Sequence, residues 1–404
     1  MIKEVGINNF KSVQDLNLPL SRFNVLIGSN GSGKSNILEA IAFGAAASAD
    51  KLDNEFLGSR GIRPSDAHLT KSAFSSSASQ PILLRFKING LEIPFTIEAE
   101  EGPILKWSVK EKILVEENIT QLMTSIVEGD KDIDKGEFED KDSEERFRKF
   151  IGGLRELIGN EDKARFMDIM KVVFEAPVNG MYKDLYYNDV LANFIIYSPE
   201  SSFLRKLEDE SQIKPLGVKG EGLFNLLRIF SESYGSETIE ELKHYLNIIE
   251  WFDDFNTVFD QSTGRRNLII KDRFIQDFSL NQSNVNEGFL FLLFYISLII
   301  SKETPSFFAI DNIDVSFHPK LCRELTSVLI QLCEKHNKQV IVTTHNPFIL
   351  DGLNLNDSAQ SLFVVRRNSE GETIADKVES QPQNIKLSDA WMRGYIGGHP
   401  ETIA

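Results

Sequence analysis

The chain has 404 residues, of which 41% are hydrophobic, so it can bury a substantial core and is not intrinsically disordered. The formal net charge of -16 excludes a surface built throughout to hold nucleic acid, because phosphate binding needs clustered Lys and Arg. It leaves a local basic groove open. The longest nearly apolar run, residues 289–300, is about half of the ~20 residues that a membrane span needs. With no apolar signal region at the N-terminus, we expect a cytoplasmic protein without a membrane contact.

Residues 1–105 are predicted to form strands interrupted by one helix. Apolar residues alternate with polar or smaller ones over residues 23–27, 84–88 and 93–97, which is the period of a β-strand. Between the first two of these segments, apolar residues recur at helical spacing over residues 37–45. We therefore expect a strand, a loop and a helix beside an antiparallel sheet.

Residues 106–190 have a different pattern, which predicts a helical insertion. Apolar residues occupy one helical face over 147–158 and another over 166–173. Residues 128–145 are acidic and nearly free of large apolar side chains, so we expect a mobile loop there.

Residues 191–404 return to alternating helices and short apolar strands. The apolar segments 307–310 and 340–342 flank a segment with a helical apolar face, residues 325–332. Strands that alternate with helices predict a parallel sheet.

A glycine-rich loop, GSNGSGKS at residues 28–35, is a full match to the phosphate-binding loop. It follows a predicted strand and precedes a predicted helix, so backbone N–H groups and the helix N-terminus can face phosphates. We expect Lys34 to reach the β- and γ-phosphates of a nucleotide, and the Ser35 hydroxyl to ligate Mg²⁺.

Two predicted buried strands end in polar residues that suit such a site. Residues 306–310 lead to Asp311, whose carboxylate fits a direct or indirect Mg²⁺ ligand, although an Asp there is also a common helix cap or turn residue. Residues 340–344 lead to His345, which suggests a side chain that touches the γ-phosphate. The order of the phosphate loop, Asp311 and His345 favours the nucleotide site.

Together, residues 27–36, 286–288, 311–319 and 343–347 resemble the SMC-like branch of the ABC ATPases. The resemblance implies an α/β fold: an ABC-type P-loop ATPase head with an antiparallel sheet lobe, a mixed, mainly parallel central sheet and the helical insertion. The head would then comprise residues 1–105 and 191–404, with ATP and Mg²⁺ as cofactors. The implied nucleotide contacts come from Asn30, Gly31, Ser32, Gly33, Lys34, Ser35 and Asn36, and the implied metal ligands are Ser35 and Asp311.

The resemblance also implies a shared site in an ATP-linked homodimer or higher homo-oligomer. Asn286, Glu287 and Gly288 open the apolar helix 289–300 and would be the signature motif that reaches the nucleotide of the other subunit. Taken alone, these three residues are an ordinary helix start. The family usually has Ser at the position of Asn286. His318 matches the family's dimer loop.

Asn312 departs from the family, which has a water-polarising glutamate after the Walker B aspartate. The implied catalytic residues are therefore Asp311, Asn312 and His345, with an amide that orients water but accepts no proton at neutral pH. We expect slow hydrolysis and little contribution from Asp314, and a pseudo-ATPase that only binds nucleotide stays an alternative.

Within this branch the chain resembles the ATPase subunits of bacterial anti-phage systems, the relatives of the overcoming-lysogenisation-defect ATPases. The residues that carry this resemblance are 194–200, 217–223, 387–391 and 397–398. It implies an ATP-gated sensor or scaffold that controls a separate effector, a nuclease or a toxin on another chain. The alternative is a DNA-repair or chromosome ATPase of the SMC type, although residues 98–190 are too short for long coiled-coil arms and show no sustained heptads.

Overall fold

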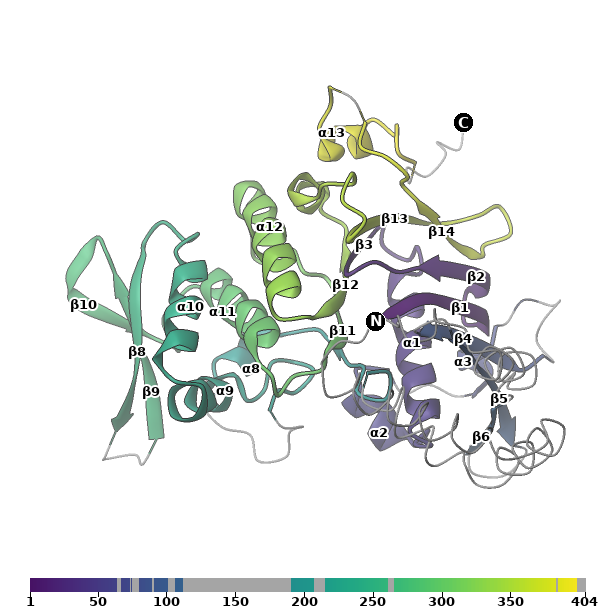
Figure 1. Cartoon of the computed structure of the whole chain (residues 1–404), viewed down its shortest axis with the longest axis horizontal. Helices are drawn as coiled ribbons and strands as arrows, with labels where there is room; N and C mark the ends of the chain where they lie inside the picture. Colours follow the sequence, from purple (N-terminus) through teal and green to yellow (C-terminus); the bar gives the residue numbers. More distant parts are fainter. Residues whose placement is uncertain are drawn as a thin grey trace, which may run out of the picture.

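The computed structural model describes residues 1–63, 67–72, 74, 80–88, 91–100, 106–111, 190–206, 215–260, 265–382 and 384–397 (Figure 1). Its strands form three sheets, and helices pack between and beside them. From residue 112 to 189 the predicted helical insertion lies outside the described residues, and so does its acidic segment 128–145. That part of the sequence analysis stays a prediction.

A six-stranded sheet forms the centre of the molecule, in the order β14-β13-β3-β12-β11-β7. All neighbouring strands run parallel except β14, which pairs antiparallel with β13. Parallel strands covered on both faces are apolar without alternation, and β3, β11 and β12 are buried at every position. The predicted mixed, mainly parallel sheet is confirmed. Its strands are β3 (Phe23–Ile27), β7 (Ile196–Tyr197), β11 (Phe307–Ile310), β12 (Gln339–Thr344), β13 (Gln360–Arg367) and β14 (Thr373–Lys377).

A five-stranded antiparallel sheet, in the order β2-β1-β4-β5-β6, forms the predicted lobe. Buried and more exposed residues alternate along β4, as expected for a strand with one face on the core. β6 lies beyond residue 105, so the lobe extends past the boundary that the sequence suggests. The strands are β1 (Ile2–Phe10), β2 (Val13–Pro19), β4 (Ile82–Ile88), β5 (Leu91–Glu100) and β6 (Lys106–Glu111).

Helix α1 (Lys34–Ser48) lies between these two sheets and is buried along almost its whole length. A helix that is apolar on all sides needs cover on all sides, and one core cluster joins α1 to side chains of both sheets. At Gly44 the helix comes so close to the lobe that an added Cβ would lie 2.5 Å from the ring of Phe86. The packing therefore fixes where α1 begins, at the phosphate loop.

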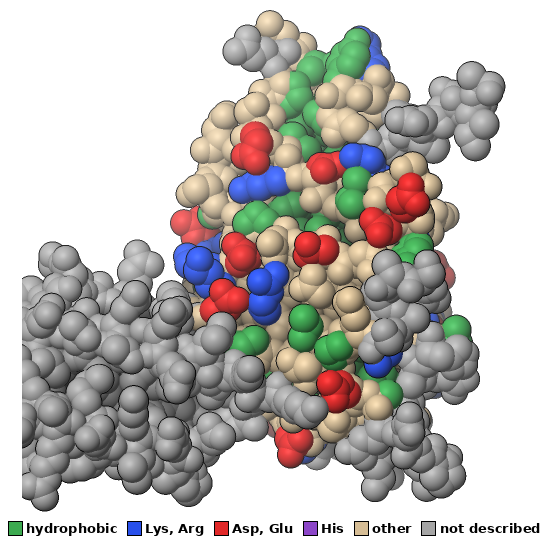
Figure 2. All heavy atoms as spheres, turned by 90° about the vertical axis from the view of Figure 1, so that its right-hand side faces the viewer, with side chains coloured by type: hydrophobic (Ala, Val, Ile, Leu, Met, Phe, Trp, Pro, Cys, Tyr) green, Lys and Arg blue, Asp and Glu red, His purple; other side chains and the backbone are tan. Residues whose placement is uncertain are grey.

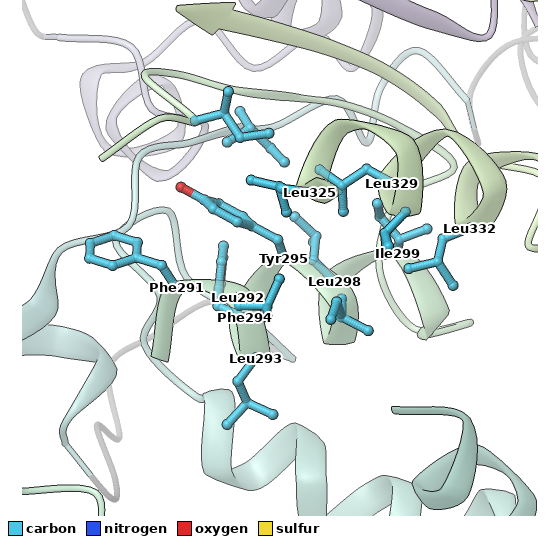
Figure 3. Close-up of a cluster of buried hydrophobic side chains, with 14 of the residues drawn as sticks. Phe291, Leu292, Leu293, Phe294, Tyr295, Leu298, Ile299, Leu325, Leu329 and Leu332 are labelled. Atoms are coloured by element: carbon cyan, nitrogen blue, oxygen red, sulfur yellow. The ribbon is translucent and has the colours of Figure 1, made fainter. Parts of the chain in front are cut away.

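The other face of the central sheet is covered by helices that share the second core cluster. Figure 3 shows side chains of α11 and α12 converging in it, among them Phe291, Leu325 and Tyr295. α11 is buried from Phe289 to its last residue, which explains its uniformly apolar sequence. The elements on this face are α8 (Ser201–Leu204), α9 (Leu223–Ile229), η2 (Phe230–Tyr234), α10 (Ser236–Leu246), α11 (Glu287–Ile300) and α12 (Pro319–Lys335).

A three-stranded antiparallel sheet, in the order β10-β9-β8, lies at the end of the molecule farthest from the lobe (Figure 1). Among the helices of the described residues, none combines the length and the apolar composition that crossing a bilayer requires. The remaining elements are β8 (Phe252–Asp260), β9 (Arg265–Asp272), β10 (Ile275–Asn281), α2 (Asn54–Ser59), α3 (Ala67–Thr70), η3 (Pro347–Gly352) and α13 (Leu387–Met392).

Candidate nucleotide-binding site

The phosphate loop joins β3 to α1 and depends on its glycines. Gly31 and Gly33 have φ values of 76° and 107°, which residues with a Cβ atom rarely adopt. A Cβ on Gly28 would lie 2.2 Å from the carbonyl oxygen of Val365, so the loop also packs tightly against β13. The loop backbone is thereby held in the curved form that presents N–H groups to an anion.

Lys34 lies at the first position of α1 and folds back over the loop. Its Nζ donates to the carbonyl oxygens of Gly28 at 2.8 Å and Ser29 at 3.0 Å, and the residue is 7% exposed. Burial lowers the pKa of the Lys34 ammonium from its ordinary value, whereas the nearby carboxylates of Asp311 and Asp314 oppose this shift. One cation and two carboxylates therefore share the mouth of the loop.

Ser35 and Asp311 meet because β11 and β3 are both neighbours of β12 in the parallel sheet. The Ser35 hydroxyl lies 3.2 Å from Oδ2 of Asp311. Hydroxyl and carboxylate oxygens are the donors that Mg²⁺ prefers, so this pair fits the ion. Within the described residues, His, Cys, Asp and Glu form no cluster of three that could hold a metal ion, so an ion here would also rely on ligand phosphates and water.

Thr343, at the end of β12, fixes the two residues that follow β11. Its hydroxyl donates to Oδ1 of Asp311 at 2.5 Å and accepts the backbone N–H of Asn312 at 2.9 Å. Asn312 has a φ of 56°, a left-handed conformation in which Asn is among the best tolerated residues. An Asn at this position therefore suits the local backbone.

Asp314 lies close to the end of β12. It is 8% exposed, accepts the Thr344 hydroxyl at 2.6 Å and lies 3.5 Å from Nε2 of His345. Together with its effect on the Lys34 pKa, this places the carboxylate within the candidate site. A weak signal was present in the sequence: an acidic residue between two apolar ones, shortly after the strand that Asp311 follows.

The predicted signature residues begin α11 and contact the loop after β11. The Asn286 side chain accepts the N–H of Phe289 at 2.9 Å as the helix cap, and Glu287 accepts the Ser316 hydroxyl at 3.1 Å. A Cβ on Gly288 would lie 3.3 Å from the carbonyl oxygen of Ser316. Among the described residues, the hydrogen bonds of this motif lie within α11 and with Ser316, and none joins it to the phosphate loop of the same chain.

Three further predicted residues occupy different places. Asn30 is exposed at the tip of the phosphate loop, whereas Asn36 donates its side-chain N–H to the Ser12 hydroxyl at 2.6 Å. His318 caps α12, since its Nδ1 accepts the N–H of Leu321 at 3.4 Å, and Pro319 follows at the first helical position. Direct ligand contacts of Asn30 and Asn36 stay predictions.

One face of the described residues carries positive and negative side chains close together. Figure 2 shows Lys and Arg side chains lying among Asp and Glu side chains on one face of the described residues. Elsewhere, Arg63 pairs with Glu39 at 3.0 Å, so a carboxylate balances its charge. This face therefore offers no broad basic area, in line with the net charge of -16.

The fold has solved counterparts. The SMC head bound to the C-winged helix domain of ScpA matches with a TM-score of 0.52 and 15% identity, over 93% of this chain and 98% of that chain. The SMC head of Thermotoga maritima matches with 0.44 and 13%, over 94% and 99%. The Smc head with an extended coiled coil and the ScpA C-terminal domain, from Pyrococcus furiosus, matches with 0.47 and 15%, over 97% and 98%. Only the first of these structures has a TM-score above 0.5, and at 15% identity the match shows a shared fold alone.

The sheet order, the phosphate loop and the polar strand ends define a P-loop ATPase domain with the ABC-type fold of SMC heads. Residues 23–351 match the AAA_21 family, described as "AAA domain, putative AbiEii toxin, Type IV TA system". Because this match spans most of the sequence, the chain belongs to that family. No curated protein sequence matches the chain. The resemblance to the SMC-like ATPases is confirmed.

Proposed function

We propose that this protein binds Mg-ATP between its phosphate loop and Asp311, closes into a head-to-tail homodimer around the nucleotide, and hydrolyses it slowly. In this state it would act as a sensor or scaffold that controls a separate effector, in defence against phage. The observation that carries the proposal is the pairing of Ser35 with Asp311 at 3.2 Å beside the buried Lys34.

The residues of the proposed site have distinct tasks. Lys34 would exchange its two loop carbonyl acceptors for phosphate oxygens, and charge-assisted bonds of this kind are shorter and stronger than neutral ones. Ser35 and Asp311 would hold Mg²⁺, which neutralises phosphate charge when bound. The Thr343 hydroxyl orients the Asp311 carboxylate, because it donates to Oδ1. His345 and Asp314 would complete the wall of the site.

The dimer is supported by the place of the signature motif. Asn286, Glu287 and Gly288 begin α11 beside Ser316, and their contacts are to that loop rather than to the phosphate loop of their own chain. A motif of this kind has a nucleotide to contact only across a subunit boundary. The N-terminus of α11 would then add its partial positive charge to the partner's nucleotide.

Slow hydrolysis is supported by Asn312. An amide orients water but accepts no proton, and general-base assistance is worth roughly 10²- to 10⁴-fold in rate. ATP would therefore act more as a clamp that keeps the dimer closed than as a fuel. An effector held on the closed dimer would be released when the dimer opens.

The proposed role in phage defence is supported by the family to which the chain belongs. Its description names a toxin of a toxin–antitoxin system, which favours an effector-linked defence role over chromosome maintenance. The SMC head of similar fold is bound to a domain of ScpA, which supports a partner protein on this kind of head. We propose that the effector is a nuclease or a toxin on another chain.

The test is a titration of purified protein with ATP, with Mg²⁺ and with excess EDTA, for the wild type and Lys34→Ala. We expect binding that depends on Mg²⁺ and weakens at least ten-fold in Lys34→Ala, because the variant loses a charge-assisted hydrogen bond. Lys51→Ala is the matched control, because Lys51 is an exposed lysine in the segment that follows α1, and this variant should bind as the wild type does. Equal affinity of the wild type and Lys34→Ala would disprove the proposed site.

The alternative of a pseudo-ATPase is favoured by the same Asn312. It predicts binding with no turnover above the rate of uncatalysed hydrolysis, even over long incubation with saturating Mg-ATP. A slow but measurable rate that Lys34→Ala abolishes would decide for the enzyme.

A further inference from the structure

A chain of hydrogen bonds reaches the back of the phosphate loop from distant parts of the sequence. The Asn36 side-chain N–H donates to the Ser12 hydroxyl at 2.6 Å, and the Ser12 and Thr373 hydroxyls lie 2.7 Å apart. The Thr373 hydroxyl in turn donates to the carbonyl oxygen of Ser32 at 3.1 Å. Asn36 lies on α1, Ser12 precedes β2, and Thr373 begins β14.

The chemistry of these groups fixes the direction of every bond. The carbonyl of Ser32 only accepts, so the single proton of Thr373 goes to it and Thr373 must accept from Ser12. Ser12 has then used its own proton and must accept from Asn36, which requires the Asn36 amide to present its N–H. Only this one arrangement satisfies all three contacts.

This chain of hydrogen bonds from Asn36 through Ser12 and Thr373 to Ser32, here called the relay, is shielded from water. A backbone hydrogen bond between its two middle residues reinforces it. Ser12, Ser32 and Thr373 are 7%, 2% and 1% exposed. The backbone N–H of Thr373 donates to the carbonyl oxygen of Ser12 at 2.7 Å, which fixes the two strands to one another. In the same hairpin, Arg367 donates from Nε to the carbonyl oxygen of Gly31 at 3.1 Å. Two consecutive carbonyls of the loop are thus held from behind.

A hydrogen bond that fixes the direction of a peptide C=O group also fixes the direction of the N–H group in the same peptide unit. The peptide unit is planar and trans, so the Ser32 C=O and the Gly33 N–H point in opposite directions. With the carbonyl held by Thr373, the Gly33 N–H points away from Thr373, toward the side of the loop that would receive phosphates in the proposed function. A Cβ on Gly33 would lie 2.0 Å from Oγ1 of Thr373, so the hydroxyl lies directly against the loop.

We propose that Ser12 and Thr373 are positioning residues of the nucleotide site, which set the peptide between Ser32 and Gly33 before a nucleotide arrives. This inference rests on the proposed function, since it concerns affinity for the phosphates of that nucleotide. Both residues lie outside the segment 23–351 that matches the family, so the family match does not assign them a role. Preorganised donors bind without first having to be ordered, which is why such a relay strengthens binding.

The experiment measures the dissociation constants of ATP and ADP for the wild type, four single variants and one double variant, together with the thermal unfolding midpoint of each. Thr373→Val removes the hydroxyl at nearly constant shape, Ser12→Ala breaks the relay one step earlier, and Thr373→Ser restores a hydroxyl. Thr326→Val is the matched control, because Thr326 is 1% exposed and donates to the carbonyl oxygen of Cys322 at 3.0 Å inside α12.

We expect Thr373→Val and Ser12→Ala each to weaken binding about ten-fold, the usual effect of leaving a buried acceptor without its donor. Thr373→Ser should stay within about two-fold of the wild type, as should Thr326→Val even where it lowers the unfolding midpoint. The double variant Ser12→Ala/Thr373→Val should lose no more affinity than Thr373→Val alone, because the relay is already broken.

Unchanged affinity in Thr373→Val would overturn the positioning role while leaving the nucleotide site intact. An equal loss in Thr326→Val would also overturn it, because the effect would then follow general destabilisation. A wild type that binds no nucleotide would instead remove the proposed function, and the relay's role with it. The two failures are therefore distinguishable in one set of titrations.

Discussion

Asp314 faces His345 across the end of β12: its Oδ2 lies 3.5 Å from Nε2 of the imidazole. The carboxylate side chain is 5% exposed, whereas the imidazole is 53% exposed. The other oxygen of the carboxylate accepts the Thr344 hydroxyl at 2.6 Å, so the group cannot turn away. A fixed, buried carboxylate therefore holds one edge of the His345 imidazole.

This geometry changes what we expect of Asp314. Asp314→Asn keeps an acceptor for Thr344 but removes the negative charge beside His345 and Lys34. Loss of such an orienting partner typically costs about 10- to 100-fold, so we expect single-turnover hydrolysis to fall by roughly ten-fold or more. In a His345→Ala background the same substitution should have little further effect, because its route through the imidazole is gone. If Asp314→Asn abolishes turnover and His345→Ala does not, the carboxylate itself would be the catalytic acid or base.

Asn312→Glu restores the carboxylate of the family and should accelerate hydrolysis, by up to about 10²- to 10⁴-fold if the side chain reaches the attacking water. The left-handed backbone at Asn312, with its φ of 56°, disfavours Glu by up to about 1 to 2 kcal/mol, so the unfolding midpoint should fall. Single-turnover hydrolysis with saturating Mg-ATP and thermal unfolding are the two measurements.

Asn312→Gly is the control for this substitution, because Gly accepts the same φ without a side chain. It should fold at least as stably as the glutamate variant and hydrolyse no faster than the wild type. An Asn312→Glu variant that is as slow as Asn312→Gly would mean that the attacking water is not placed beside this residue.

Gly288→Asp should prevent ATP-linked dimerisation. A side chain there begins 3.3 Å from the Ser316 carbonyl and places a second carboxylate beside Glu287, at the helix N-terminus that would face the partner's nucleotide. In sedimentation velocity, a non-hydrolysable ATP analogue should convert the wild type to dimer and leave Gly288→Asp monomeric. Gly58→Asp is the matched control, since nothing lies within 4 Å of a Cβ at that position. Identical sedimentation of the wild type with and without the analogue would exclude the shared site.

Lys338 predicts a rise of stability with pH. Its Nζ donates to the carbonyl oxygens of Thr304 at 2.8 Å and Pro305 at 3.2 Å, and burial lowers its pKa from 10.5 to about 8. Between these two pKa values the unfolded chain keeps a proton that the native protein has lost, so native stability increases with pH through this window. Below pH 8 this contribution is absent.

The measurement is the free energy of unfolding between pH 7 and pH 10.5 for the wild type and Lys338→Met. The wild type should gain up to about 3 kcal/mol relative to the variant across the window, since one pKa unit is worth about 1.36 kcal/mol. Lys302→Met, at an exposed lysine, is the control and should show no such gain. Parallel curves for the wild type and Lys338→Met would mean that Lys338 titrates normally.

Strands and helices with a clear apolar pattern in the sequence were predicted correctly. The strand before the phosphate loop and α1 follow from periodicity, α11 was expected from the resemblance to the SMC-like ATPases, and the parallel sheet follows from strands that alternate with helices. The lobe strand β6 was not predicted, because Trp107 and Val109 are its only apolar residues and so short an alternation is a weak signal. The juxtaposition of Ser35 and Asp311 was expected from the motif order and is what the sheet register brings about.

The contacts that tune the site lay beyond the reach of local patterns. Asp314 meets Thr344 across 30 residues, and Ser12 meets Thr373 across 361 residues. Single serines and threonines occur throughout the chain, so nothing in the sequence marks these two as partners. The left-handed backbone at Asn312 is equally hidden, because Asn is common in many conformations.

The order of the strands in the central sheet also determines when that sheet can form. β3 carries the phosphate loop, yet both of its neighbours, β12 and β13, come from the far end of the sequence. Asn24 bonds the carbonyl oxygen of Val340 across 316 residues. At a synthesis rate of about 5–20 residues per second, β3 leaves the ribosome roughly 15 to 60 s before either neighbour exists. The nascent phosphate-loop strand therefore lacks both of its neighbours until β12 and β13 have been synthesised, and nucleotide cannot assist the folding of this sheet before then.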